Sequence, residues 1–214
     1  MKQSSPRPGS ARPSRSVRPW LAASAAALAL LGGPGAAAAT AAPAPVGSYD
    51  GLGSYNGLLP VAELSAQRLA IADLVAAAKW GTAGPIDDPA REQQVLDTVA
   101  RQADELGADP AATVRIFRDQ IEANKDVQRA LHRRWDADPA KAPTEKPDLA
   151  VVRVEINRVN DSLVRAIADS AQERSASHCE GTLLLSAARV RNEEHLDLVH
   201  TAALGRSLRS VCAA

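Results

Sequence analysis

Residues 109–135 read DPAATVRIFRDQIEANKDVQRALHRRW and carry the clearest periodic pattern in the chain. Alternating steps of three and four residues define one stripe: Val114, Phe117, Ile121, Asn124, Gln128, Leu131 and Trp135. Such steps place side chains on one face of an α-helix. The Asp109-Pro110 pair favours a helix start, because aspartate accepts hydrogen bonds from free N–H groups of the first turn and proline suits the first helical position. The segment therefore predicts a long helix with one face toward a core.

The preceding segments have similar patterns and end signals. We expect a first helix from about Leu58 to Trp80, which the sequence GTAGP at 81–85 would end. Its inner stripe consists of Leu64, Arg68, Ile71, Val75 and Ala78-Lys79. The Asp88-Pro89 pair predicts the start of a second helix, and Gly107 predicts its end.

The second half of the chain also has helical patterns. A linker at 136–147 precedes a fourth helix, which we expect to start near Asp148. Its inward side chains are Leu149, Val152, Ile156, Val159, Leu163 and Ile167. The sequence Ser177-His178-Cys179-Glu180 matches a capping box and predicts the start of the last helical region. No segment has a convincing period of two, and the low aromatic content of 3% favours helix over sheet. We predict an all-α fold, a single helical domain of about six helices.

The first 41 residues differ from the rest of the chain. Their basic residues are Lys2, Arg7, Arg12, Arg15 and Arg18. An apolar run from Leu21 to Leu31 and the small residues Ala39-Thr40-Ala41 follow. This order is typical of a secretory signal peptide, and the apolar run is too short to span a bilayer by itself. An uncleaved membrane anchor is the alternative.

These features divide the chain into three parts. We assign 1–41 to a signal peptide, 42–57 to a flexible mature N-terminus rich in Gly, Ala, Pro, Ser and Tyr, and 58–214 to the helical domain. We expect a secreted or extracytoplasmic protein that has no contact with the membrane after signal cleavage.

The charge balance argues against a nucleic-acid partner. The full chain has 25 basic and 25 acidic residues, and the leader holds five of the basic residues and none of the acidic ones. The mature chain then has 20 basic and 25 acidic residues, a net charge of −5. A net-acidic protein is a poor candidate for nucleic-acid binding.

The two cysteines, Cys179 and Cys212, should form a disulfide in an exported protein, although two free thiols are an alternative. On one straight helix they would lie about 50 Å apart. A disulfide requires Cα atoms within about 7 Å of each other. The segment must therefore fold back, and we place the turn near Arg191 to Glu194, between two short antiparallel helices.

Polar side chains interrupt the apolar stripes. Arg68 and Lys79 are eleven residues apart, close to three helical turns, so they share one face of the first helix. Asn124 and Gln128 are four residues apart and therefore neighbours on the third helix.

Two further cations lie on other helices. Arg91 begins the inner stripe of the second helix, followed by Val95 and Val99, and Arg153 lies beside the stripe of the fourth. A single arginine near a stripe usually extends to solvent or forms an ion pair. A charge that faces a core is costly unless it is paired, so four converging cations and two amides predict a pocket for an anionic ligand.

Other catalytic signatures are missing from the sequence. The four histidines lack metal-ligand spacing, there is no Gly-x-Ser-x-Gly motif, and a disulfide would use both cysteines. A reaction that needs neither a nucleophile nor a cofactor fits what remains. Five motifs then resemble the secreted, gamma subclass of the all-helical chorismate mutases: AQRL at 66–69, AKW at 78–80, PIDDPARE at 85–92, FRDQI at 117–121 and PDL at 147–149.

The resemblance implies roles for individual residues. Arg68, Arg91 and Arg153 match positions that hold the two carboxylates of chorismate. Lys79 and Gln128 match the donors to its ether oxygen, and Lys79 also matches the contact to an adjacent carboxylate. The implied catalytic residues are Lys79, Gln128 and Arg68.

Three more substrate-binding residues follow from the same resemblance. Asp88 and Glu92 match polar positions near the substrate hydroxyl, and Asn124 stands where the family often has Ser or Thr. The family implies a type II-like fold, an isomerase that converts chorismate to prephenate without cofactor or metal, and a homodimer. The alternative is an exported helical module that binds a small dicarboxylate without turnover.

Overall fold

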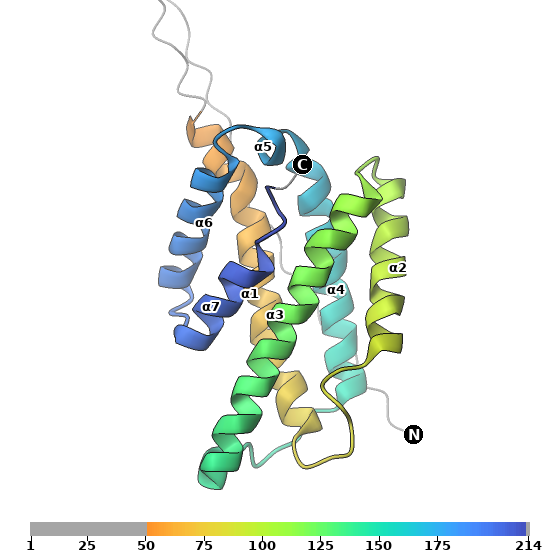
Figure 1. Ribbon diagram of the computed structural model, residues 1–214, viewed down its shortest axis with the longest axis vertical. Helices are drawn as coiled ribbons and strands as arrows, with labels where there is room; N and C mark the ends of the chain where they lie inside the picture. The colour runs from red at the N-terminus through yellow and green to blue at the C-terminus, as the bar shows by residue number, and fades with distance from the viewer. Residues whose placement is uncertain (1–50, 213–214) are drawn as a thin grey trace, which may run out of the picture. The chain divides into compact units, whose positions relative to one another are not determined.

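The computed structural model describes residues 51–212, which form seven α-helices, one short 3-10 helix and no strand. In chain order the elements are α1 (Gly51–Lys79), α2 (Pro89–Glu105), α3 (Pro110–Ala137), η1 (Pro139–Lys141), α4 (Leu149–Asp169), α5 (Ala171–Ser175), α6 (Cys179–Glu193) and α7 (Leu198–Ser207) (Figure 1). The all-α prediction is confirmed. The expected signal peptide at 1–41 lies outside the described residues.

Three helices begin where the Asp signals place them. Asp88 Oδ1 accepts a hydrogen bond from the Arg91 N–H at 3.1 Å, and Asp109 and Asp148 accept equivalent bonds at the starts of α3 and α4. Gly107 follows α2 with φ +70°, a left-handed conformation that glycine adopts without strain. These boundaries depend only on residues close in sequence, which is why the sequence predicts them.

The start of α1 corrects the expected boundary at Leu58. The helix begins at Gly51, so 51–57 belong to α1, and only 42–50 of the expected flexible N-terminus fall outside the described residues. Near this end α1 contacts α5, where a Cβ atom at Gly57 would come within 2.8 Å of the Glu173 side chain.

The expected capping box at 177–180 is wrong. The Cys179 N–H donates to the Ala176 carbonyl and closes a turn that contains Ser177 and His178. α6 therefore begins at Cys179, with His178 instead of Ser177 at the N-cap position and no side-chain hydrogen bond at the cap. This turn follows α5, a short helix that the sequence did not indicate. Arg174 holds α5 in place by donating to the Ile167 and Val211 carbonyls.

Helix α1 packs against α3, α4 and α6, and α2 packs against α3 and α4 (Figure 1). The expected inner face of α3 faces α1 and the site described below. A second buried face of α3, absent from the sequence prediction, comprises Ile116, Gln120, Ala123 and Val127. Gln120 on this face donates to Ser65 Oγ and to the Ser207 carbonyl, so it joins α3 to both α1 and α7.

The disulfide prediction is confirmed. Cys179 and Cys212 are bonded, with Cα atoms 5.8 Å apart. α6 and α7 fold back on each other as expected, although the turn lies at 194–197, slightly later than predicted. None of the described helices is long and apolar enough to cross a membrane.

Candidate active site

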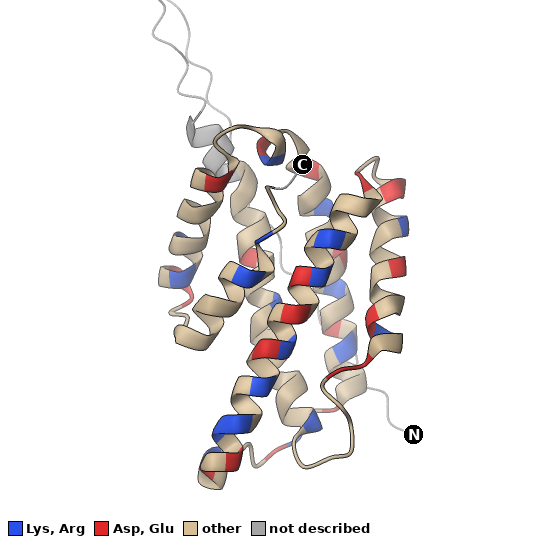
Figure 2. Cartoon of the chain, in the orientation of Figure 1, with Lys and Arg blue, Asp and Glu red and all other residues tan. Residues whose placement is uncertain are grey.

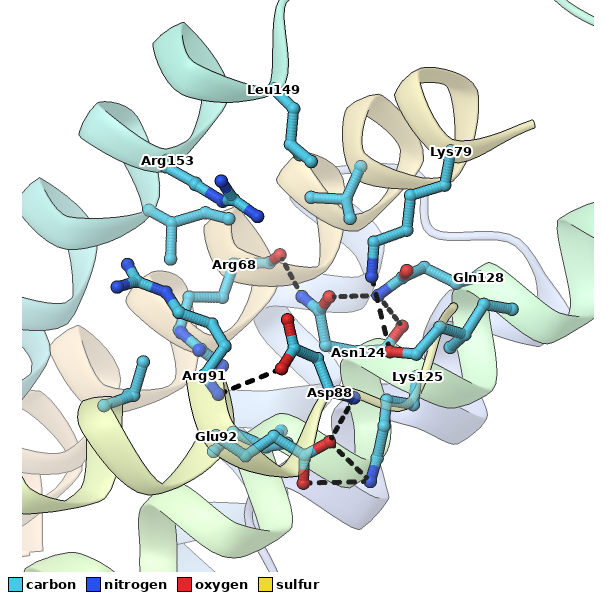
Figure 3. Close-up of a pocket in the computed structure, with 15 residues that line it drawn as sticks. Arg68, Lys79, Asp88, Arg91, Glu92, Asn124, Lys125, Gln128, Leu149 and Arg153 are labelled. Atoms are coloured by element: carbon cyan, nitrogen blue, oxygen red, sulfur yellow. Dashed lines mark hydrogen bonds and ion pairs between the residues drawn. The ribbon is translucent and has the colours of Figure 1, made fainter. Parts of the chain in front are cut away.

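The eight residues singled out in the sequence all line one pocket of about 120 Å³ between α1, α2, α3 and α4 (Figure 3). They are Arg68, Lys79, Asp88, Arg91, Glu92, Asn124, Gln128 and Arg153. In Figure 3 the three arginines gather on one side of the pocket, and Lys79 and Gln128 lie on the other. Apolar side chains of Val75, Ile121, Leu149 and Ile156 complete the wall. Six of the eight, Arg68, Lys79, Arg91, Asn124, Gln128 and Arg153, were placed on or beside inward helix faces by periodicity, whereas Asp88 and Glu92 were implied only by the family resemblance.

Arg68 is the most buried cation of the pocket. Only 5% of its surface is exposed, and burial lowers the pKa of its guanidinium to about 10. Its Nε donates to Asn160 Oδ1 at 2.7 Å, its Cζ lies 5.6 Å from the centre of the Phe117 ring, and its buried Nη1 has no hydrogen-bond partner among residues 51–212. The guanidinium therefore has an unused donor in a region shielded from water.

The other three cations are more accessible. Arg91 donates to the amide oxygens of Gln94 and Asn157, both at 3.3 Å, and Arg153 is exposed at the pocket edge. Lys79 Nζ donates to the Pro85 carbonyl at 2.8 Å and the Ile86 carbonyl at 3.3 Å. Burial lowers the pKa of Lys79, with Asp88 opposing the effect and Arg153 adding to it.

The two amide side chains on α3 form a chain of hydrogen bonds that ends at the backbone of α1. Asn124 Nδ2 donates to the Arg68 carbonyl at 2.9 Å, and Gln128 Nε2 donates to Asn124 Oδ1 at 3.0 Å. Both side chains are buried. The second contact of Gln128 Nε2, to the Asn124 carbonyl, is long at 3.4 Å, and the buried Gln128 Oε1 has no hydrogen-bond partner among the described residues.

Lys125 also lines the pocket and was missed by the sequence analysis. Its Nζ lies 3.2 Å from both carboxylate oxygens of Glu92 and 3.3 Å from Asp87, and it forms an ion pair with Glu122. Burial alone would lower the pKa of Lys125, but hydrogen bonds to Glu122 and Glu92 outweigh it and raise the pKa. Lys125 lies on α3, along which Figure 2 shows interspersed acidic and basic residues. The only feature of the sequence that could have indicated Lys125 as a pocket residue is its position next to Asn124.

The charges of the pocket do not balance. Within the described part of the chain, no carboxylate lies at ion-pair distance from Arg68, Lys79, Arg91 or Arg153, whereas Lys125 is paired with Glu92. Apart from Glu92, Asp88 is the one acidic residue among those that line the pocket. The excess of positive charge suits a ligand with more than one negative group. No group of three or more His, Cys, Asp or Glu residues in 51–212 could hold a metal ion.

Comparison with known proteins agrees with this geometry. The profile of chorismate mutase type II matches residues 61–129. The secreted chorismate mutase of Mycolicibacterium smegmatis is 36% identical over 155 residues, covering 72% of this chain and 86% of the relative. The chain belongs to the secreted chorismate mutases. A second family member, the secreted chorismate mutase of Mycobacterium tuberculosis, is 33% identical over 166 residues, covering 76% of this chain and 83% of the relative.

A solved chorismate mutase from Burkholderia phymatum has the same fold. Its TM-score is 0.71 at 34% identity, and the match covers 75% of this chain and 99% of that one. Membership in a family whose relatives are secreted makes this chain a secreted or extracytoplasmic chorismate mutase. The family match ends at residue 129, within α3, so Arg153 on α4 lies outside the matched range. The packing of α4 against the other helices places Arg153 at the pocket.

Proposed function

We propose that this chain is an isomerase that converts chorismate to prephenate in the pocket between α1, α2, α3 and α4. The observation that carries the proposal is the set of four converging cations without a carboxylate partner in the described range, centred on the buried guanidinium of Arg68. Chorismate is a dianion, and its two carboxylates would supply the missing counter-charges.

The three arginines would hold the two carboxylates. Arg68 offers its unused Nη1 from the pocket floor, and Arg91 and Arg153 face the same space from α2 and α4. The rearrangement is intramolecular, so its rate depends on how often the substrate adopts the reactive conformer. Fixing both carboxylates would restrict chorismate to that conformer and lower the entropic part of the barrier.

Lys79 and Gln128 would act on the breaking C–O bond, which leaves negative charge on the ether oxygen. Lys79 Nζ is already held by two carbonyls of the 81–88 loop, and the long contact of Gln128 Nε2 to the Asn124 carbonyl could give way to one with the ether oxygen. Donors fixed before the reaction stabilise developing charge without reorganising. No proton transfer is required, so the reaction needs neither a general acid or base nor a cofactor.

The remaining polar residues would complete the substrate contacts. Asp88 and Glu92 would accept a hydrogen bond from the substrate hydroxyl. Lys125 and the Asp88 N–H, at 3.3 Å, hold the Glu92 carboxylate in place. Asn124 would act through its bonds to Arg68 and Gln128. We further propose that the protein is a homodimer that binds neither nucleic acid nor, after signal cleavage, the membrane. The exposed Leu184, Leu185 and Leu198 on α6 and α7 would suit a subunit contact.

The test is loss of the ultraviolet absorbance of chorismate on adding purified mature protein, with prephenate identified in the product. Catalysis that saturates with chorismate is the expected result. Saturable binding of chorismate without loss of absorbance would instead show a dicarboxylate-binding module, and absence of both would show a structural protein. Light scattering of the same sample measures the oligomeric state.

A further inference from the structure

The partner of the Arg68 guanidinium is neutral. Asn160 on α4 accepts a hydrogen bond from Arg68 Nε through Oδ1 at 2.7 Å, and both residues are buried, with 4% and 5% of their surfaces exposed. Arginine is almost never fully buried in proteins unless its charge is paired, because an unpaired buried charge is costly. Here an amide occupies the place where a counter-ion would be expected.

Asn160 lies between two cavities. Arg68 faces the active-site pocket, whereas Asn160 lines a neighbouring polar cavity between α2 and α4, and Arg91 borders both. The Arg68–Asn160 pair is therefore part of the wall that separates them. The hydrogen bond at Nε fixes the plane of the guanidinium, because its donors form a rigid fork. With that plane fixed, Nη1 keeps one direction and remains without a partner in the described residues.

We propose that Asn160 is a positioning residue that orients Arg68 without neutralising it, so that the charge of Arg68 remains available for an anionic substrate. The inference rests on the proposed function of the pocket and extends it to a residue outside the pocket. Aspartate has nearly the same shape as asparagine. At this position it would keep the hydrogen bond from Nε but cancel the guanidinium charge and repel a substrate carboxylate.

Two variants of Asn160 should rank in opposite orders for stability and for substrate binding. Asn160→Asp supplies a counter-ion to a buried guanidinium, so the melting temperature should stay the same or rise. Asn160→Ala removes the acceptor and leaves Nε unpaired, so the melting temperature should fall. The KM for chorismate should rise most in Asn160→Asp, by roughly tenfold or more, and less in Asn160→Ala, because alanine leaves the charge intact.

The experiment measures kcat, KM and melting temperature for the mature wild type, Asn160→Asp and Asn160→Ala. Asn192→Asp is the matched control, because Asn192 is exposed on α6 and the substitution adds the same charge far from Arg68. We expect the control to keep wild-type kinetics. The expected outcome is a folded Asn160→Asp protein with a raised KM and a smaller change in kcat.

Three outcomes would overturn the proposal. The first is a KM of Asn160→Asp within twofold of the wild type. The second is failure of Asn160→Asp to fold, because a carboxylate beside the Arg68 guanidinium should be accommodated in the folded protein. The third is a larger rise of KM in Asn160→Ala than in Asn160→Asp, which would mean a structural role alone. An inactive wild type would refute the proposed function itself, and this is measured first.

Discussion

Arg68 and Lys79 illustrate how one helix face can supply both substrate binding and charge stabilisation. They lie on the same face of α1, Arg68 buried in the pocket floor and Lys79 near its mouth. We expect Arg68→Ala and Lys79→Ala each to lower kcat/KM at least ~100-fold, roughly 2.7 kcal/mol of transition-state stabilisation. Arg133→Ala, at an exposed position on α3, is the control. Near-wild-type kinetics in a variant that circular dichroism shows to be folded would remove that residue from the site.

Gln128 gives a prediction on pH dependence. An amide donates at any ordinary pH, whereas a glutamate donates only when protonated. We therefore expect nearly constant wild-type kcat from about pH 5 to 8. Burial lowers the pKa of Lys79, so the loss of activity on the alkaline side should begin at a lower pH than for a lysine in water. Gln128→Glu should work best in acid and lose activity as pH rises through the pKa of the new carboxyl group.

The surroundings of Gln128 determine where that loss occurs. Burial, a dianionic substrate and the facing Asn124 Oδ1 should raise the pKa of the new carboxyl group above its ordinary value of about 4.3, and Lys79 should oppose the rise. The measurement is kcat against pH for both proteins. A variant equal to the wild type at pH 8 would mean that Gln128 does not contact the ether oxygen.

At the scale of elements, Lys125 joins α3 to α2 and to the 81–88 loop. It contacts Glu92 and Asp87, while the same loop holds Lys79 through its carbonyls. Lys125→Met should release Glu92 and the loop, and remove positive charge beside the pocket. We expect a loss of about tenfold in kcat/KM, roughly 1.4 kcal/mol. Lys141→Met, which breaks only an exposed ion pair with Asp138, should change little. Equal kinetics in the two variants would show that Lys125 has no positioning role.

His200 joins α7 to α1 and makes stability depend on pH. A hydrogen bond to Asp73 and one to Asp197 outweigh burial and raise the pKa of His200 to about 9. A raised folded-state pKa stabilises the fold fully below the unfolded value of about 6.5, and this contribution declines as pH rises and is lost above about 9. His200→Gln should therefore be less stable than the wild type at pH 6, and the two should converge by about pH 9.5. Denaturant unfolding at both pH values measures the difference, and a gap independent of pH would contradict it.

At the scale of the whole molecule, the sequence predicted what depends on local neighbours and missed what depends on how helices pack. Aspartate caps at α2, α3 and α4 and the stripe of α3 follow from short-range rules. Asn160 directly follows Val159 of the expected stripe on α4, yet its contact with Arg68 depends on the rotation of α4 against α1. The ion pairs of Lys125 depend likewise on the separation of α2 and α3. Periodicity specifies neither quantity.

The arrangement of the site predicts that it is complete within one chain. Arg153 on α4 lines the same pocket as Arg68 on α1, and no residue of a second chain is needed to place three arginines there. In a dimer with shared sites, mixing Arg68→Ala with Arg153→Ala protein would rebuild one intact site per mixed dimer. Random exchange would then restore about a quarter of wild-type activity. With sites inside single chains, each site in the mixture keeps one defect.

We therefore expect the mixture of Arg68→Ala and Arg153→Ala proteins to have no more activity than the average of its components. The two variants carry different affinity tags, so that sequential purification proves that mixed dimers are present before chorismate turnover is measured. A mixture of wild type and Arg68→Ala treated in the same way controls for losses during exchange. Activity of the purified mixed dimer near half that of wild type would place Arg153 in the site of the other chain. Background activity in that dimer would mean that the fold of a single chain brings together all the cations needed to hold a dianion.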